Sequence, residues 1–198
     1  MTQPDFERAR QYARERLTRD LSPDYHYHSL WHTQNEVVPA AERLAEQESV
    51  SGDSLLLLRT AAWFHDLGCI VQRTEHEAIG VGIAQAVLPA LGYSRDQLRA
   101  IQNMVMATRL PQTPHSLLDQ ILADADLDVL GRHDFFSRNA ALRAELAAFG
   151  ITWPERLWNQ NQIDFLQAHQ YFTSAARNLR NEQKQRHIEI LIALVAQG

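Results

Sequence analysis

The sequence predicts an all-α protein, and three observations support this fold class. Glycine and proline are scarce, at 8 and 7 of 198 residues, and the long segments between them carry apolar residues at helical spacing. No window shows sustained alternation of apolar and polar residues with β-branched enrichment, as a half-buried strand would. The length and a hydrophobic share of 45% suit one domain that buries a sizeable core.

The first two helices are separated by a short turn. Pro4 suits a first helical turn and the Ser-Pro-Asp sequence at 22–24 stops the helix, so we expect it over about 4–21. The second helix is expected over about 29–47, after a short stretch rich in aromatic residues and histidine. Pro39 lies inside this second helix, which predicts a kink or an early break there.

The third helix is expected to form the buried centre of the fold. It follows a loop at 49–52, and Asp53 or Ser54 can cap it. Residues 55–64 are apolar nearly all round, which is typical of a helix surrounded by other helices. Gly68 is expected to end it, because glycine tolerates a left-handed conformation at a helix C-terminus.

Turn residues and caps divide the rest of the chain. Gly92 and Gly131 are expected to stop helices, and Ser94 opens a helix with the spacing of a capping box. The remaining expected helices cover residues 75–91, 94–109, 116–130, 135–149 and from 155 to the C-terminus. No linker or internal repeat separates these segments, so the part after about Gly131 is expected to pack on the rest as extra helices.

Composition excludes several classes of protein. The formal net charge is −5 and there is no basic block, so we expect no nucleic-acid partner and no membrane partner. Cys69 is the single cysteine, which excludes an intramolecular disulfide and a cysteine-cluster metal site, and we expect it to pack as a small apolar residue. The sequence shows no signal peptide and no spanning segment, so the expected compartment is the cytoplasm.

A histidine and an aspartate lie side by side at the C-terminal end of the apolar third helix, as His65 and Asp66. A buried carboxylate costs several kcal/mol unless it is paired or bound to a metal. An aspartate at a helix C-terminus also opposes the helix dipole. We therefore expect a positive group beside Asp66, which is either a divalent cation or an arginine such as Arg59 or Arg109.

Two further histidines, His28 and His32, are four residues apart, so on a helix they would lie on the same side. Two imidazoles at this spacing can bind one metal ion, or one can bind the metal while the other contacts a ligand. The alternative is the start of an amphipathic helix, with its leucine and tryptophan turned to the core and its histidines half exposed.

Three aspartates, Asp124, Asp126 and Asp128, alternate with apolar residues further along the chain. If this stretch is helical, at least one of the three points towards the core and needs a partner. The alternative is a capped helix with two surface aspartates and one structural hydrogen bond.

Together these segments resemble the HD superfamily of metal-dependent phosphohydrolases, whose pattern is a His, a His-Asp pair and a distal Asp on a helical bundle. The matching segments read YHSLWH at 27–32, AAWFHDLG at 61–68 and DADLDVLG at 124–131. The resemblance covers about residues 25–131. It implies one HD-like domain over 1–198, with a core over about 22–131 and a C-terminal helical extension over about 132–198.

The resemblance also implies a metal centre. One divalent ion (Mn, Fe, Co, Ni or Zn, with Mg less suited) would be held by His32, His65, Asp66 and Asp126. Asp124 is the alternative for the distal ligand. Family members with two metals carry two further histidines, and His76 could be the first of these. Residues 107–111 hold no histidine where the second would fall, which favours one metal.

The implied activity is hydrolysis of a small phosphate ester, such as a nucleotide, by a metal-activated water. In it Asp66 would hold the ion and orient the water, and His76 or His28 would protonate the leaving oxygen. His28 and Arg109 would contact the substrate. The alternatives are a non-catalytic regulatory domain that binds a metal or a nucleotide, and a helical interaction protein whose histidines are incidental. A homodimer through an exposed helix is a further expectation.

The C-terminal third is rich in aromatic residues. These suit an aromatic core helix, and the alternative is a lid in which His169 or Tyr171 stacks on a base or a sugar. The residues concerned are Trp153, Trp158, Phe165, His169, Tyr171 and Phe172.

Overall fold

Every regular element is helical in the computed structural model, which describes residues 3–197. The all-α prediction is confirmed for these residues, and the outermost residues of the expected 1–198 domain lie outside them. The elements in order are α1 (Phe6–Asp20), α2 (Leu30–His32), η1 (Thr33–Val37), α3 (Val38–Gln47), α4 (Gly52–Phe64), η2 (Leu67–Ile70), α5 (His76–Val87), η3 (Leu88–Leu91), α6 (Arg95–Ala107), α7 (Leu117–Asp126), η4 (Asp128–Gly131), α8 (Phe135–Ala148), α9 (Glu155–Ala168) and α10 (Ser174–Gln197).

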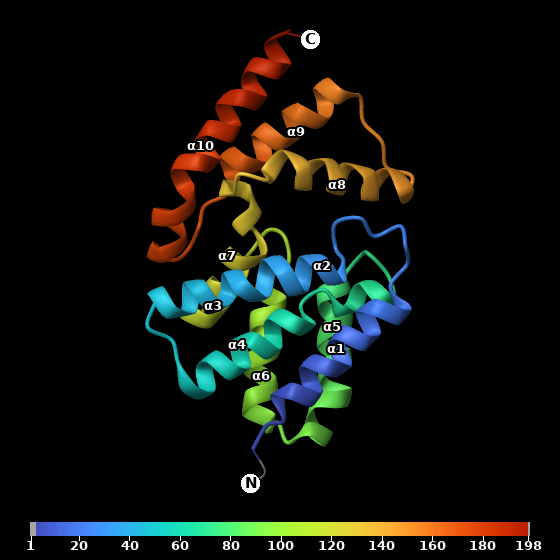
Figure 1. Ribbon diagram of the computed structural model, residues 1–198, viewed down its shortest axis with the longest axis vertical. Helices are drawn as coiled ribbons and strands as arrows, with labels where there is room; N and C mark the ends of the chain where they lie inside the picture. Colours follow the sequence, from blue (N-terminus) through green and yellow to red (C-terminus); the bar gives the residue numbers. More distant parts are fainter. Residues whose placement is uncertain (1–2, 198) are drawn as a thin grey trace.

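The helices lie in two tiers (Figure 1). Helices α1 to α7 form the lower bundle of the view, and α8, α9 and α10 cover its upper end, with α8 above α2 (Figure 1). Helix α10 contacts α9, η4 and α3, and α8 contacts η4. The segment after Gly131 thus packs on the bundle as extra helices, against η4, which belongs to the distal Asp motif.

Helix α4 forms the centre of the lower bundle, as its apolar sequence predicts. Its residues Leu58, Ala61 and Phe64 are fully buried, and the helix contacts α1, α3, α6 and α7. Its C-terminal end is therefore held inside the fold, and the His-Asp pair follows directly.

Several predicted helix ends are confirmed. Ser94 makes a capping box at the start of α6, and Gly92 adopts a φ of 87° after η3. The expected helix from 155 onward is divided into α9 and α10, and α10 is 24 residues long.

Within residues 3–197, no helix combines the length and the apolar character that crossing a membrane would require.

The break expected near Pro39 takes the form of a π-helical turn. This turn, η1, lies between α2 and the start of α3, directly before the proline. Pro39 has no backbone N–H for a regular helical hydrogen bond, and a wider turn accommodates its ring. His32 directly precedes this turn and Glu36 lies within it, and both are buried.

The third helix begins and ends differently from the prediction. Ser51 is its N-cap, rather than Asp53 or Ser54, and the helix ends at Phe64. Gly68 is not one of the glycines with positive φ, so its expected left-handed role is wrong. A Cβ at Gly68 would lie 1.9 Å from the carbonyl oxygen of His76. The glycine is needed because the start of α5 passes against η2 at this point.

Candidate metal centre

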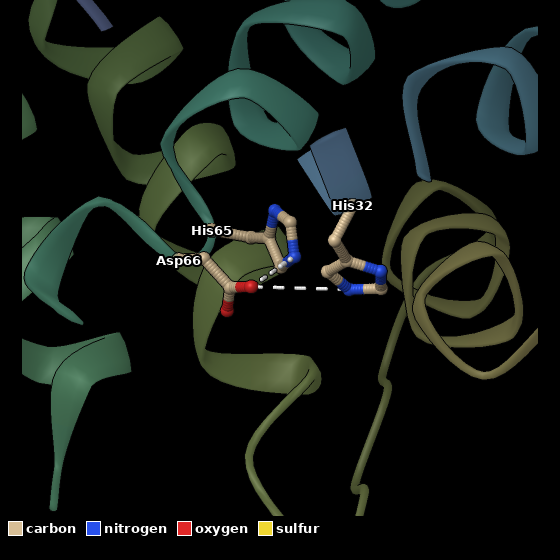
Figure 2. Close-up of side chains that lie close together, drawn as sticks. All are labelled: His32, His65 and Asp66. Atoms are coloured by element: carbon tan, nitrogen blue, oxygen red, sulfur yellow. Dashed lines mark ion pairs between the residues drawn. The ribbon is translucent and has the colours of Figure 1, made fainter. Parts of the chain in front are cut away.

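The end of α4 supplies His65 and Asp66 to the candidate site. Nδ1 of His65 donates a hydrogen bond to the carbonyl oxygen of Ala62 at 2.8 Å. Because a carbonyl only accepts, Nδ1 carries a proton, and in the neutral ring Nε2 keeps a lone pair. Nε2 lies 3.2 Å from Oδ2 of Asp66, and both side chains are buried (Figure 2).

Helix α2 brings His32 to the same place (Figure 2). Nδ1 of His32 lies 2.9 Å from Oε2 of Glu36, a buried carboxylate that also pairs with Arg132 at 2.7 Å and Arg138 at 3.0 Å. Glu36 thereby accepts a hydrogen bond from Nδ1 of His32 and turns its Nε2 inward, to 3.8 Å from Oδ2 of Asp66. His32 is 1% exposed, so the alternative of a half-exposed histidine is wrong here.

The structure separates the two candidate distal aspartates. Oδ1 of Asp126 lies 3.3 Å from Nε2 of His32 and 3.4 Å from Nε2 of His65. Asp124 faces away from the imidazoles and accepts hydrogen bonds from the backbone N–H groups of Phe172 and Thr173, both at 2.8 Å. Asp126 therefore completes the cluster, and Asp124 ties the segment before α10 to α7.

Two buried atoms of the cluster have no hydrogen-bond partner, and they are Nε2 of His65 and Oδ2 of Asp66. Buried polar atoms are nearly always satisfied, so two that face each other indicate a group that both can bind. A divalent cation fits, because a nitrogen lone pair and a carboxylate oxygen can bind it together. The complete donor set of two imidazoles and two carboxylates suits Mn, Fe, Co, Ni or Zn, and its members are His32, His65, Asp66 and Asp126.

The charges of the cluster also favour a cation. Burial alone would raise the pKa of Asp66, but the charge of His65 and the close approach of His65 and His76 hold it well below its ordinary value. Burial alone would lower the pKa of His65, but the charge of Asp66 and the close approach of Asp126 raise it well above its ordinary value. The two carboxylates therefore draw positive charge to this point, as protons or as a metal ion.

His76 lies on the other side of Asp66. Helix α5 begins at His76, as predicted, and its Nδ1 donates to the carbonyl oxygen of Arg73 at 2.8 Å. Its Nε2 lies 3.3 Å from Oδ1 of Asp66. Asp66 thus directs one oxygen at the imidazoles of the cluster and the other at His76.

We expect protons and a divalent cation to compete for these imidazoles. Burial would lower the pKa of His76, but the hydrogen bond and the charge of Asp66 raise it to about 9. This lies above the value of roughly 6.5 for an unfolded chain. A raised folded-state pKa contributes stability that is complete below pH ~6.5 and is lost as the pH rises through the folded-state value. Because the pKa values of Asp66 and Asp126 are lowered, both carboxylates stay ionised between pH ~6.5 and about 9.

The melting temperature of chelator-treated protein should therefore fall as the pH rises from about 6.5 to about 9. The additional stabilisation by excess Mn²⁺ should grow over the same interval, because the imidazoles must lose their protons to bind a metal. Thermal melts at a series of pH values, with chelator and with Mn²⁺, measure both effects. Stabilisation by Mn²⁺ that does not change with pH would contradict this expectation.

His28 reaches the site from outside a helix. Helix α2 begins at Leu30 with Ser29 as its cap, close to the expected start at about residue 29, so His28 precedes the helix and the same-side spacing with His32 does not apply. The ring centre of His28 nevertheless lies 6.2 Å from that of His32 and 5.7 Å from that of His76.

A cavity of about 450 Å³ opens from the cluster towards the C-terminal helices. Its inner end is lined by His28, Asp66, His76 and Asp126. The opposite wall comes from α8, α9 and the segment between them, through Leu142, Leu146, Trp153, Trp158, Asn161 and Phe165. The C-terminal helices therefore complete the cavity that the bundle begins.

The expected arginines lie elsewhere. Arg59 pairs with Glu42 at 2.6 Å, and Arg109 pairs with Glu75 at 3.3 Å, so neither is the partner of Asp66. Arg109 does not line the cavity, although both of its sequence neighbours do, and its role towards a substrate stays a prediction. The arginines that line the cavity are Arg73 and Arg138, which sequence reasoning missed because neither belongs to a motif.

Cys69 lies close enough to Asp66 and His76 for the three to form a second group of potential metal ligands. Burial, followed by the charge of Asp66, raises the pKa of the Cys69 thiol. A metal binds the thiolate, so the proton on this sulfur opposes ligation. Cys69 is 3% exposed, as expected of a packing residue.

The aromatic residues of the C-terminal third divide between two roles. Trp153, Trp158 and Phe165 line the cavity. His169 and Tyr171, which the lid interpretation named, do not line it, and the hydroxyl of Tyr171 donates to the carbonyl oxygen of Leu127 at 3.2 Å. Aromatic residues therefore do cover the site, but they come from α9 and the segment before it.

Comparisons with known proteins agree with this geometry. The family model for the HD domain matches residues 34–128. The matched segment contains His65, Asp66 and Asp126, and it begins two residues after His32. A search of curated proteins finds no match.

Solved structures share the fold over nearly the whole chain. A predicted HD superfamily hydrolase from an uncultured Thermotogales bacterium has a TM-score of 0.65 at 20% identity, covering 98% of this chain and 93% of that one. A protein of Lactobacillus plantarum has a TM-score of 0.72 at 20% identity, with 97% and 95% covered. YpgQ of Bacillus subtilis, solved in complex with ADP, has a TM-score of 0.68 at 16% identity, with 98% and 94% covered. The chain thus contains an HD domain at residues 34–128, as its motifs predict.

Proposed function

We propose that the protein is a metal-dependent phosphohydrolase that cleaves a small phosphate ester, and that its substrate is a nucleotide. The observation that carries this proposal is the lining of the cavity. It joins residues of the His-Asp cluster, where a phosphate would bind, to aromatic residues of the C-terminal helices. A molecule that suits this lining has a charged group and a flat, uncharged group.

The chemistry of the far end supports a nucleobase. All of the residues that α9 contributes are uncharged, namely Trp158, Asn161, Gln162 and Phe165. Asn139 also lines this cavity, and its Oδ1 is buried without a hydrogen-bond partner. Aromatic rings stack on a base, and amide groups can bond to its edge. YpgQ, which shares the fold, was solved in complex with ADP, which is a nucleotide.

The inner end supplies the groups that phosphate hydrolysis needs. A divalent cation held by His32, His65, Asp66 and Asp126 would polarise a phosphoryl oxygen and lower the pKa of water beside it. Asp66 can serve this cation through Oδ2 while Oδ1, on the side of His76, orients the attacking water. Nε2 of His76, when protonated, can donate to the leaving oxygen. Arg73 and Arg138 line the cavity and can neutralise the phosphate charge that the cation does not neutralise.

A substrate panel tests this function. The purified, Mn²⁺-loaded protein would be incubated with phosphomonoesters, phosphodiesters and nucleoside mono-, di- and triphosphates, and the products identified by ³¹P NMR. We expect turnover of at least one nucleotide, and the released phosphate or pyrophosphate would identify the bond. Folded, metal-loaded protein that hydrolyses nothing would overturn the proposal. Nucleotide binding without turnover would favour the non-catalytic regulatory domain instead.

Trp153→Ala should weaken nucleotide binding without affecting small substrates. Stacking of a base on an aromatic ring contributes ~1–3 kcal/mol, so KM for a nucleotide should rise by roughly tenfold. Steady-state kinetics with a nucleotide and with glycerol phosphate measure the two effects. Leu157→Ala is the matched control, because Leu157 is 47% exposed and does not line the cavity. Equal changes in KM for both substrates would contradict a base-binding role.

A further inference from the structure

A buried glutamate of the C-terminal helices reaches the N-terminal side of the site. Glu145 lies on α8, outside the segment that matches the HD domain, and it is fully buried. Its Oε2 accepts hydrogen bonds from the backbone N–H groups of Tyr27 at 2.8 Å and His28 at 2.9 Å. Its Oε1 lies 2.5 Å from Nδ1 of His28. All of these contacts join α8 to the short segment before α2.

The contacts determine which nitrogen of His28 carries the proton. Burial would raise the pKa of Glu145, but the hydrogen bond from Nδ1 of His28 and those from the two backbone N–H groups hold it below its ordinary value. Glu145 is therefore a carboxylate, which can only accept hydrogen bonds. Nδ1 of His28 must then donate, and in the neutral ring Nε2 keeps its lone pair. The ring of His28 lines the cavity beside His76.

The other histidines of the site are held in the same way. Nδ1 of His32, His65 and His76 each lies 2.8 to 2.9 Å from an oxygen atom, and Nε2 of each faces the carboxylates. In these three cases the oxygen belongs to a residue three or four positions away in the sequence. His28 differs, because its oxygen comes from Glu145, 117 residues further along the chain.

We propose that Glu145 is a positioning residue, which keeps a proton on Nδ1 of His28 and points Nε2 at the cavity, where the lone pair of the neutral ring accepts a hydrogen bond from the bound substrate or its attacking water. The C-terminal helices thus do more than cover the site, since they set the tautomer of one of its imidazoles. A contribution of Glu145 to turnover rests on the proposed hydrolase function. Its effect on the His28 tautomer can be measured without any turnover.

Glu145→Gln is the variant that tests this role. The glutamine Oε1 can still accept from the backbone N–H groups of Tyr27 and His28, but its NH₂ group then faces Nδ1 of His28. A donor at that place requires Nδ1 to accept, so the ring should switch to the tautomer with the proton on Nε2. We expect the fold to be preserved, because the side chain keeps its size and its two backbone hydrogen bonds.

The first readout is the tautomer itself. Long-range ¹H–¹⁵N spectra of Zn²⁺-loaded protein with ¹⁵N-labelled histidine distinguish the two tautomers, and the signals missing in His28→Ala assign the ring. We expect Nδ1 to be protonated in the wild type and Nε2 in Glu145→Gln. A wild-type ring with its proton on Nε2 would overturn the proposal, even if the variant failed to fold.

The second readout is turnover. Loss of such a supporting hydrogen bond lowers activity by ~10–100-fold, so we expect kcat of Glu145→Gln to fall by this factor with KM little changed. In a His28→Ala background the same substitution should have almost no further effect, because Glu145 acts through His28. Glu182→Gln, a glutamate with an 81% exposed side chain on α10, is the matched control.

The outcomes separate the two claims. An equal fall in kcat in both backgrounds, or an unchanged His28 tautomer in folded Glu145→Gln, would refute the positioning role. A wild-type protein that shows the expected tautomers but hydrolyses no phosphate ester would refute the proposed function and leave the positioning of His28 by Glu145 in place.

Discussion

Asp66→Asn should abolish both metal binding and phosphate hydrolysis. The carboxylate lies between the imidazoles of the cluster and His76, at 3.2 Å from His65 and 3.3 Å from His76. Asparagine keeps the shape but loses the charge that holds a cation, and it offers only one weakly binding oxygen. A metal ion contributes several kcal/mol to the transition state, so kcat should fall by at least ~1,000-fold. Metal content by mass spectrometry and hydrolysis of the best substrate measure the two effects.

The matched control is Asp164→Asn, on an exposed part of α9 away from the cavity lining. It should retain one metal ion per chain and full activity. Helicity of both variants should equal that of the wild type, because neither aspartate caps a helix through its side chain. An Asp66→Asn variant that still binds one metal ion and turns over substrate at an undiminished rate would show that Asp66 is not a ligand.

Asp124→Ala should destabilise the fold and leave the metal site intact. Asp124 is fully buried and accepts three hydrogen bonds, two from backbone N–H groups and one from the hydroxyl of Thr173. Each buried donor left without a partner costs ~1–3 kcal/mol, so the free energy of unfolding should fall by about 3 kcal/mol. For a chain of this length the melting temperature should drop by roughly 6–12 °C. Thermal melting followed by circular dichroism measures this change.

Asp126→Ala is the matched variant, and it should lose the metal while keeping most of its stability. Its side chain faces the imidazoles of His32 and His65, and it is not needed to hold the segment before α10. Loss of the metal and of activity, with a smaller change in melting temperature under chelator, is expected. If Asp124→Ala loses the metal and keeps its stability, the assignment of the two aspartates is reversed.

The sequence predicted the helices and the residues of the cluster because both depend on local signals. Apolar spacing identified α4 as the buried centre, and serine and glycine marked the ends of α6 and η3. The resemblance to the HD superfamily named His32, His65 and Asp66, and the structure brings all three together. Their roles as metal ligands stay predictions for the experiments above.

Other features depend on contacts that a local pattern does not contain. The choice between Asp124 and Asp126 was open in the sequence, because it is decided by the backbone of residues 172–173, which lies 48 to 49 positions away. Glu145 gave no local signal, since its partners lie in the segment before α2. Gly68 gave a misleading one, because its need for glycine arises from the close approach of α5 rather than from its own backbone angle.

A crystal structure of the Mn²⁺-loaded protein, with anomalous diffraction to locate the metal, tests the central claim most directly. We expect one Mn²⁺ ion bound by Nε2 of His32, Nε2 of His65 and carboxylate oxygens of Asp66 and Asp126, at about 2.0–2.3 Å. An ion held elsewhere, or no ion at these four side chains while the cluster keeps its present geometry, would contradict the account.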